Sequence, residues 1–192
     1  LNIVLSLNRP GYVDRLQEYR QALTQRNAAL KAHAPTEAVA PWSEGLVRAG
    51  SDVILGRQDW VADVAEEFAQ TYRDVSGGEG ARLSYRSSGS RAAASAPDEL
   101  RSREQIESDF RASLDAAYNR DERYCTTSVG PHRDELRVTF GDGTAAENQE
   151  VRTYGSGGQR RTAALALRLV EAATVRRARG HAPLVLLDDA FA

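Results

Sequence analysis

The sequence predicts an α/β protein in two parts, a mainly α-helical arm over residues 1–123 and an α/β lobe over residues 124–192. In the first part, apolar residues recur at helical spacings of three and four. In the second part, alternating apolar and polar residues flank turn-forming glycines. A helical segment rich in alanine and leucine then precedes an apolar run at residues 184–187, which is typical of a buried strand.

The first helix is predicted over residues 11–30, with one buried face. Its apolar positions are Tyr12, Leu16, Tyr19, Leu23 and Leu30. A second helix is predicted over residues 41–75, with Pro41 in its first turn and a glycine pair at residues 77–78 as its stop. Its apolar positions are Leu46, Val53, Val61, Val64, Phe68, Tyr72 and Val75.

Glycines interrupt this second helix at three positions: Gly45, Gly50 and Gly56. Each glycine weakens an isolated helix by up to about 1 kcal/mol relative to alanine. We therefore expect a bend in the helix, or close packing of another helix against it.

The next segments are a short strand at residues 81–86, a serine- and alanine-rich loop at 87–96 and a third helix over about 98–123. The apolar positions of this helix are Ile106, Phe110, Leu114 and Ala117. Three amphipathic helices of this kind are able to pack as a compact arm or antiparallel bundle.

The pattern changes near residue 124, where we place a domain boundary. Residues 124–129 and 136–140 read as two strands around the Gly-Pro-His-Arg-Asp turn at 130–134. A helix over 158–179, a break at Gly180 and the closing apolar strand follow.

Ser156, Gly157, Gly158 and Gln159 open the last helix, and we call these four residues the serine–glycine loop. Free backbone N–H groups and the positive end of the helix dipole favour an anion at such a place, here the γ-phosphate of ATP. A flexible turn is the alternative, because glycine clusters are common. The long helix and the acidic strand that follow favour the phosphate.

Two carboxylates, Asp188 and Asp189, follow the closing strand directly. Asp188 is placed to coordinate Mg²⁺, directly or through water, and Asp189 to orient or deprotonate the attacking water. The alternative is a pair that only caps the strand or a following helix. The four apolar residues before the pair favour the metal role.

A phosphate-binding P-loop needs a lysine in the pattern Gly-x-x-x-x-Gly-Lys-Ser/Thr. The only lysine is Lys31, which follows Leu30, so the chain has no P-loop. We therefore expect the chain to complete a site on a second protomer that carries the nucleotide, and not to bind nucleotide tightly or hydrolyse it alone.

His132 and Arg133 lie in the Gly-Pro turn, where a ligand role and simple local hydrogen bonding both remain open. His33 and His181 have no metal-ligand spacing with each other or with Cys125. Arginines cluster in and near the last helix, where they either bind phosphate groups or stabilise the helix dipole. They are Arg160, Arg161, Arg168, Arg176, Arg177 and Arg179.

Composition and net charge limit the classes of function that this chain can have. The formal net charge of −2 over 192 residues gives no global attraction to nucleic acid, so a DNA contact requires a local arginine patch or a further region. No apolar run is long enough for a membrane span. The single cysteine, Cys125, fits a reducing, cytoplasmic compartment. The chain has no methionine, even at position 1, so we expect a fragment of a longer protein.

Four stretches resemble the RecF family of bacterial DNA-repair ATPases, which belong to the ABC/SMC class. They are residues 19–27, the turn and strand start at 130–136, residues 156–160 with the helix at 165–168, and residues 186–189. They cover nearly the whole chain in the order of the family. The Gly-Pro-His-Arg-Asp turn before the serine–glycine loop is the most specific of them.

The resemblance implies an α-helical arm followed by the distal lobe of an ABC-type P-loop NTPase head, which pairs head to head around two ATP molecules with Mg²⁺. Ser156 to Gln159 then correspond to the ABC signature and Asp188 to the Walker B magnesium residue. Asp189 stands where many relatives carry a catalytic glutamate. The implied partners are duplex or gapped DNA, recombination-mediator proteins and a second copy of the protein in an ATP-dependent homodimer.

The sequence departs from the family pattern in two ways. Gly155 stands at a position that is often apolar in ABC signatures. The P-loop lobe would precede Leu1, and the chain stops at Ala192, where the family's D-loop begins. Two other functions remain open: another SMC- or ABC-type ATPase, and a helical DNA- or protein-binding module in which the paired aspartates are only structural.

Overall fold

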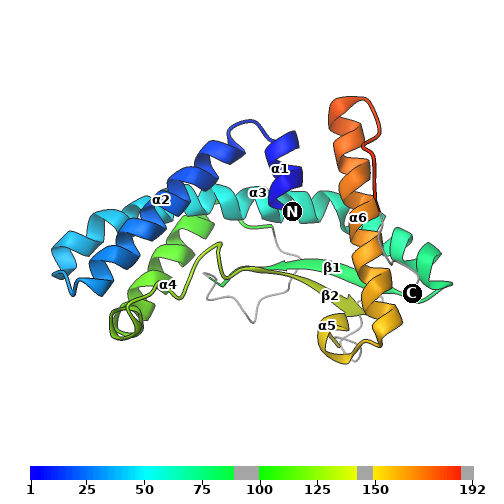
Figure 1. Ribbon diagram of the computed structural model, residues 1–192. Helices are drawn as coiled ribbons and strands as arrows, with labels where there is room; N and C mark the ends of the chain where they lie inside the picture. Colours follow the sequence, from blue (N-terminus) through cyan, green and yellow to red (C-terminus); the bar gives the residue numbers. More distant parts are fainter. Residues whose placement is uncertain (89–99, 142–148, 187–192) are drawn as a thin grey trace. The chain divides into compact units, whose positions relative to one another are not determined.

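The computed structural model describes residues 1–88, 100–141 and 149–186. The elements are α1 (Asn2–Asn8), α2 (Tyr12–Lys31), α3 (Thr36–Ser76), β1 (Ala81–Arg86), α4 (Arg103–Tyr124), β2 (Glu135–Phe140), α5 (Val151–Tyr154) and α6 (Gly157–Arg179), labelled in Figure 1. None of the described helices is both long and apolar enough to cross a membrane.

The described residues form two compact units. The helical unit combines Pro10–Asp59 with Arg86–Glu135. The second unit, which we call the loop-bearing unit because it contains the serine–glycine loop, combines Leu1–Arg9, Trp60–Tyr85 and Leu136–Ala192. The boundary expected near residue 123 falls inside the helical unit, so residues 124–135 pack with α2 and α4. The assignment of an arm and a distal head lobe stays a prediction.

The helical unit contains α2, the first part of α3, and α4. The predicted apolar stripe of α4 is fully buried, at Ile106, Phe110, Leu114 and Ala117. Ser102 caps this helix, because its side chain accepts a hydrogen bond from the backbone N–H of Gln105 while the Gln105 side chain bonds back. The three helices expected from spacing all form, and their ends lie within five residues of the predicted limits.

The long helix α3 begins earlier than expected. It starts at Thr36, so Pro41 lies inside the helix and not in its first turn. The prediction of close helix packing is confirmed at Gly50, where a Cβ atom would meet Phe110 Cε1 at 2.6 Å and the Tyr19 ring at 3.2 Å. At Gly45 the nearest atom, Ala22 Cβ, would lie at 3.4 Å.

The sheet of the described residues has two strands, β1 and β2. Gly141, just after β2, donates to the carbonyl of Gly80, just before β1, over 3.0 Å, so the two strands run in opposite directions. A further antiparallel bridge joins Thr139 to Glu150, at the start of α5. The predicted strands at 81–86 and 136–140 are both confirmed, and Figure 1 shows them side by side.

The strand predicted over residues 124–129 is absent, which corrects the expected strand order. Cys125 has left-handed backbone geometry at the end of α4, with φ 51°. The amide of Thr127 donates to the Asn27 side chain over 2.8 Å, and the amide of Ser128 donates to the Asp121 side chain over 3.0 Å. These amides are therefore bonded to side chains and are not available to a neighbouring strand.

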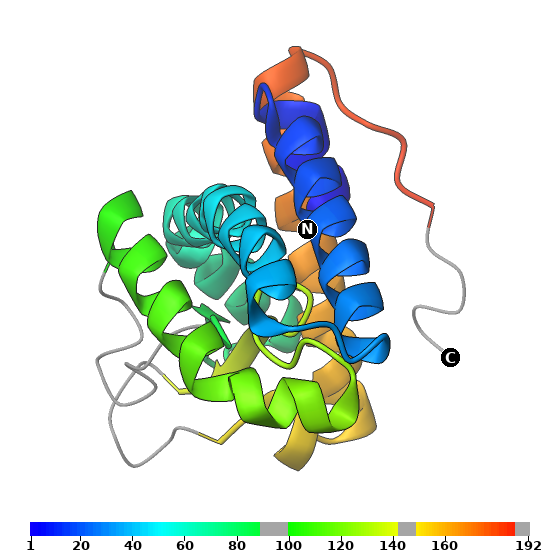
Figure 2. The same cartoon turned by 90° about the vertical axis from the view of Figure 1, so that its left-hand side faces the viewer.

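The loop-bearing unit is built around α6, against which α1 packs (Figure 2). The buried side chains of α6 are Ala163, Ala166, Val170 and Glu171. Gly180 ends the helix in the left-handed conformation at φ 75°, as the sequence predicted.

The prediction of a buried closing strand is also wrong for its described part, residues 184–186. Residues 182–186 have no strand geometry, and Leu184 and Leu186 are 86% and 84% exposed. A buried strand needs neighbours on both sides for its hydrogen bonds, and the two described strands pair with each other elsewhere.

Candidate functional site

The serine–glycine loop lies where α5 meets α6: Gly155 and Ser156 connect the two helices, and Gly157, Gly158 and Gln159 begin α6. Ser156 is the N-cap of α6, and its hydroxyl oxygen accepts a hydrogen bond from the Gln159 amide over 3.2 Å. In return, the Ser156 amide donates to Gln159 Oε1 over 2.9 Å. This reciprocal capping box fixes both ends of the loop and satisfies two of the donors that a helix start leaves open.

Gly155 is required by the local backbone. Its amide donates to the Val151 carbonyl over 2.9 Å, which closes the turn of α5. A Cβ atom at this position would collide with that same carbonyl oxygen and would lie 3.1 Å from Val151 Cγ1. The departure from the family pattern at Gly155 therefore has a steric cause inside this chain.

Gly157 and Gly158 differ from Gly155, because nothing in the described chain requires them to be glycine. Neither has positive φ, and a Cβ atom at Gly157 would meet nothing within 4 Å. At Gly158 the nearest atom would be Ser156 Oγ, at 3.9 Å. No hydrogen bond within the described residues engages their amides, and both residues are exposed.

Gln159 has a second contact, to Glu79 in the turn between α3 and β1. Its side-chain Nε2 donates to Glu79 Oε2 over 3.1 Å. Sequence reasoning missed Glu79, because the two residues are 80 positions apart. No local pattern reports a contact over that separation.

All six predicted arginines of α6 are exposed. Arg177 is paired with Glu67 of α3 over 2.8 Å, and Arg168 with Glu171 over 2.6 Å. At the end of α6 the positive charges also stabilise the helix dipole.

Asp188 and Asp189 lie outside the described residues, so their predicted metal and catalytic roles are untested. Within residues 1–88, 100–141 and 149–186, no group of three His, Cys, Asp or Glu side chains is placed to hold a metal ion. The capping box and the open amides of Gly157 and Gly158 suit an anion such as a phosphate group.

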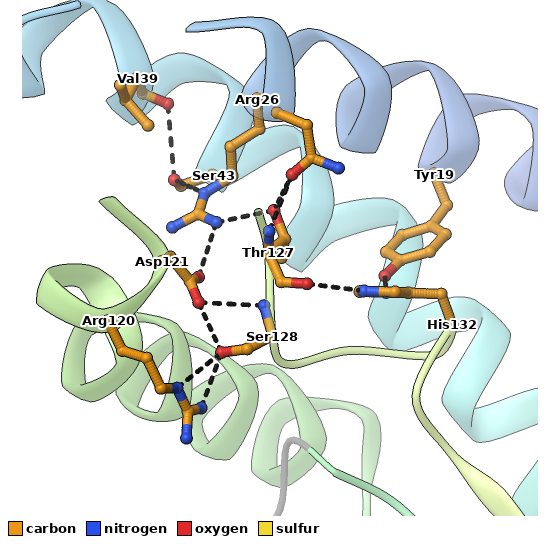
Figure 3. A network of polar contacts seen from close by, with 10 residues as sticks. Tyr19, Arg26, Val39, Ser43, Arg120, Asp121, Thr127, Ser128 and His132 are labelled. Carbon is orange, nitrogen blue, oxygen red and sulfur yellow. Dashed lines mark hydrogen bonds and ion pairs between the residues drawn. The ribbon is translucent and has the colours of Figure 1, made fainter. Parts of the chain in front are cut away.

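The Gly-Pro-His-Arg-Asp turn lies in the helical unit, where His132 is bonded at both ring nitrogens (Figure 3). Its Nδ1 lies 2.6 Å from the Tyr19 hydroxyl, and its Nε2 lies 3.0 Å from the Thr127 carbonyl. Since a carbonyl only accepts, Nε2 carries the proton, and in the neutral ring Nδ1 accepts from Tyr19. Local hydrogen bonds thus engage both ring nitrogens of His132, and Arg133 is exposed.

The titration of this pair agrees with the geometry. Burial raises the pKa of Tyr19, so its hydroxyl keeps the proton that it donates. Loss of water around the imidazole lowers the pKa of His132, which favours the neutral ring, and the charge of Arg133 acts in the same direction.

Two further contacts fix the turn. Arg57 donates to the Pro131 carbonyl over 2.6 Å. The Ser88 amide and hydroxyl donate to Asp134 over 2.7 and 2.8 Å. Gly130 has φ 127°, and a Cβ atom there would lie 2.6 Å from the Tyr19 hydroxyl, so the turn requires glycine at this position.

A buried ion pair lies next to the turn. Arg26 of α2 is 1% exposed and Asp121 of α4 is 0% exposed, with 2.8 Å between Nη1 and Oδ2. Arg26 also donates to Ser43 over 3.0 Å and to Thr127 over 2.8 Å (Figure 3). Asp121 accepts from the Ser128 amide and hydroxyl. The network ties two helices to the segment before the turn.

This ion pair was not predicted from the sequence, although the helical spacing of the two residues indicates it. Arg26 lies four residues after Ala22 and four before Leu30, on the buried face of its helix. Asp121 lies four residues after Ala117 and continues the apolar stripe of α4. Opposite charges in the buried stripes of two helices predict a partner inside the core.

Comparison with known proteins shows similarity along the whole chain. No family model matches. The DNA replication and repair protein RecF of Salinibacter ruber is 36% identical over 198 residues, which cover 100% of this chain and 45% of that protein. RecF of Anaeromyxobacter sp. strain K is 37% identical over 182 residues, covering 94% of this chain and 45% of that protein.

Two solved structures of RecF are also similar to this chain over nearly its whole length. The recombination mediator protein RecF with ATP, in the RecFOR pathway, superposes with a TM-score of 0.83 at 25% identity, covering 98% of this chain and 48% of that one. The corresponding RecF-ATPrS structure gives a TM-score of 0.79 at 26% identity, over 93% of this chain and 46% of that one. The chain thus spans about half the length of the proteins that it matches.

Proposed function

Since the chain matches RecF along its whole length and corresponds to about half of that protein, we propose that it is the arm and the distal head lobe of a RecF-like, ATP-dependent DNA-binding protein. The full-length protein acts in recombinational repair and gap repair. It forms head-to-head dimers that enclose ATP and Mg²⁺, and the dimers hold duplex or gapped DNA and cooperate with recombination-mediator proteins.

The observation that carries the nucleotide role is the pair of open amides at Gly157 and Gly158. The capping box occupies the amides of Ser156 and Gln159, which leaves the two glycine amides free. The Ser156 oxygen accepts from Gln159, so its own proton is free to be donated outward. Three donors at a helix start are suited to the γ-phosphate of a nucleotide held by a second protomer.

The presence of glycine at residues 157 and 158 supports the close approach of a ligand, from outside the described chain, to the backbone of these residues. Glycine is less favourable than alanine in a helix by roughly 1 kcal/mol, and no contact or backbone angle in the described chain offsets this. A ligand that comes within hydrogen-bonding distance of the backbone provides the missing reason, because a methyl group would hold it away.

The acidic pair has a complementary role in the proposal. Asp188 binds Mg²⁺ and neutralises the phosphates, and Asp189 orients or deprotonates the attacking water. When bound, the metal ion supplies charge stabilisation to the transferring phosphoryl group.

The test is the substitution Gly157→Ala in the full-length protein. A methyl group at residue 157 has room and an allowed backbone, so thermal stability should be unchanged or slightly raised. ATP-dependent dimerisation, measured by analytical ultracentrifugation, should weaken by about tenfold or more, equivalent to about 1.4 kcal/mol.

Gly45→Ala is the matched control, because it places a methyl group on another helix of the chain with only one neighbour, at 3.4 Å. It should dimerise like the wild type. Unchanged dimerisation of the Gly157→Ala protein would contradict the close approach of phosphate to this loop and would favour a helical binding module.

A further inference from the structure

Glu79 is held in a fixed place between α3 and β1. The chain turns at Gly77 and Gly78, with φ 79° and 118°, directly after α3 ends at Ser76. The Ser76 hydroxyl reaches the Glu79 carbonyl over 3.0 Å, and the carbonyl of Gly80 accepts from Gly141 over 3.0 Å. The backbone is therefore bonded on both sides of the Glu79 side chain.

The Glu79 carboxylate determines which way the Gln159 amide group points. A carboxylate only accepts hydrogen bonds, so it takes the Nε2 end of the amide, at 3.1 Å. The Oε1 end is then directed at the Ser156 amide, at 2.9 Å. If the amide group were reversed, both of these contacts would become repulsive.

We infer that Glu79 is a positioning residue for the serine–glycine loop. It acts through Gln159, whose side chain it orients into the capping box with Ser156. This inference rests on the proposed function for its consequence, which is that the Ser156 hydroxyl and the amides of Gly157 and Gly158 are aligned before a phosphate arrives. Glu79 itself does not contact the nucleotide.

A purely electrostatic role makes the opposite prediction. A negative charge near an anion site repels the anion, so removal of the charge would strengthen ATP-dependent association. Glu79→Gln separates the two roles, because its side-chain oxygen still accepts from Gln159 while the charge is lost. Glu79→Ala removes both the charge and the acceptor.

The first measurement is hydrogen–deuterium exchange of the full-length protein without nucleotide. Glu79→Ala should raise exchange of the Ser156 and Gln159 amides, which the capping box engages, by about fivefold, the loss expected for one hydrogen bond. Glu79→Gln should stay near the wild type. Glu66→Ala is the matched control, since Glu66 is exposed on α3 and carries the same charge, and it should change nothing in this segment.

The second measurement is ATP-dependent dimerisation of the same proteins. Glu79→Ala should weaken dimerisation by about fivefold while ATP binding to the separate protomer is unchanged, because the P-loop is not in this chain. In a Gln159→Ala background, Glu79→Ala should have no further effect on exchange or on dimerisation.

The two proposals fail in different ways. If the wild-type protein does not dimerise with ATP, the proposed function fails, and the exchange measurement still decides the role of Glu79. The inference about Glu79 is overturned by unchanged exchange in the Glu79→Ala protein. It is also overturned if Glu79→Gln is as impaired as Glu79→Ala, or if either variant dimerises more tightly than the wild type.

Discussion

Arg26 is a charged residue in the core of the helical unit, and three acceptors offset the cost of its burial. They are the side chains of Asp121, Ser43 and Thr127, and the Thr127 hydroxyl in turn donates to Asn27. Removal of a charge from water is expensive unless the charge is paired and fully hydrogen-bonded. The network therefore specifies how α2, α4 and residues 127–128 fit together.

Arg26→Met should destabilise the protein strongly, because it leaves the Asp121 carboxylate buried without its countercharge. The expected loss is about 3–5 kcal/mol in the free energy of unfolding, measured by urea titration. Arg111→Ala is the control: Arg111 pairs with Glu44 at the surface, where such pairs contribute about 1 kcal/mol or less. Equal losses for the two variants would contradict the assignment of Arg26 to a buried network.

His132 links the stability of the helical unit to pH. Its pKa in the folded chain lies below the ordinary value of about 6.5, so between these two values the unfolded chain binds more protons. Its contribution to stability is complete above about pH 6.5 and declines as the pH falls through that window.

We expect the free energy of unfolding to decrease between about pH 7 and 5.5, and this slope to shrink in the His132→Gln protein. The titration of the His132 ring by NMR gives an independent check, and a midpoint above the ordinary range would contradict the lowered pKa.

At the scale of elements, α3 shows how glycine positions allow two helices to approach. The rings of Phe110 and Tyr19 lie where a Cβ atom of Gly50 would be, at 2.6 and 3.2 Å. The same two side chains cover Gly130 in the turn, where a Cβ atom would meet Phe110 Cζ at 2.9 Å. Both glycines therefore let aromatic side chains of α2 and α4 pack against the backbone.

Gly50→Ala and Gly45→Ala should change stability in opposite directions, although both replace a glycine of α3 by the better helix former. At residue 45 the methyl group has ordinary contact space, and a gain of up to about 1 kcal/mol is expected. At residue 50 the methyl group forces the Phe110 ring to move, and a net loss of about 1–3 kcal/mol is expected. Thermal unfolding of the two variants measures both effects, and a stabilising Gly50→Ala substitution would show that the helices are not in close contact.

Ion pairs also join α3 to α4. Asp52 of α3 pairs with Arg103 of α4 over 2.7 Å, and Glu44 of α3 pairs with Arg111 of α4 over 2.9 Å. Each such pair contributes little by itself, since both partners are partly solvated. Their alternation between α3 and α4 favours one register of the two helices over its neighbours.

At the scale of the whole molecule, the features predicted from sequence are those that depend on nearby residues. The spacing of apolar residues locates α2 and α4, and Gly180 marks the end of α6 because glycine readily adopts the left-handed conformation seen there. The capping box at Ser156 was not predicted, although it is also a local pattern, with glutamine three residues after serine.

The features that were missed depend on residues far apart in the chain. Residues 124–129 alternate like a strand, but Asn27 and Asp121 take the amides that a strand would use. The contact of Glu79 with Gln159 joins two turns that no local pattern relates. The apolar run before Asp188 reads as a strand, but a strand forms only where other strands accept its hydrogen bonds.

The last prediction concerns the full-length protein and separates an ATPase from a binding module. In the proposal, Asp189 orients or deprotonates the water that attacks the γ-phosphate, while binding of ATP depends on other groups. Asp189→Asn should therefore lower ATP turnover by about a hundredfold or more, as loss of a general base does. The same protein should still dimerise with ATP, and the dimers should persist because hydrolysis no longer ends them.

Asp188→Asn is the contrasting variant, because loss of a metal ligand weakens binding of the Mg²⁺–ATP complex itself and should prevent dimers from forming. ATP turnover and dimer lifetime, measured on the same samples with and without DNA, distinguish the ATPase from the binding module. If Asp189→Asn leaves the turnover and the lifetime at wild-type values, the paired aspartates are structural and the chain belongs to a DNA- or protein-binding module.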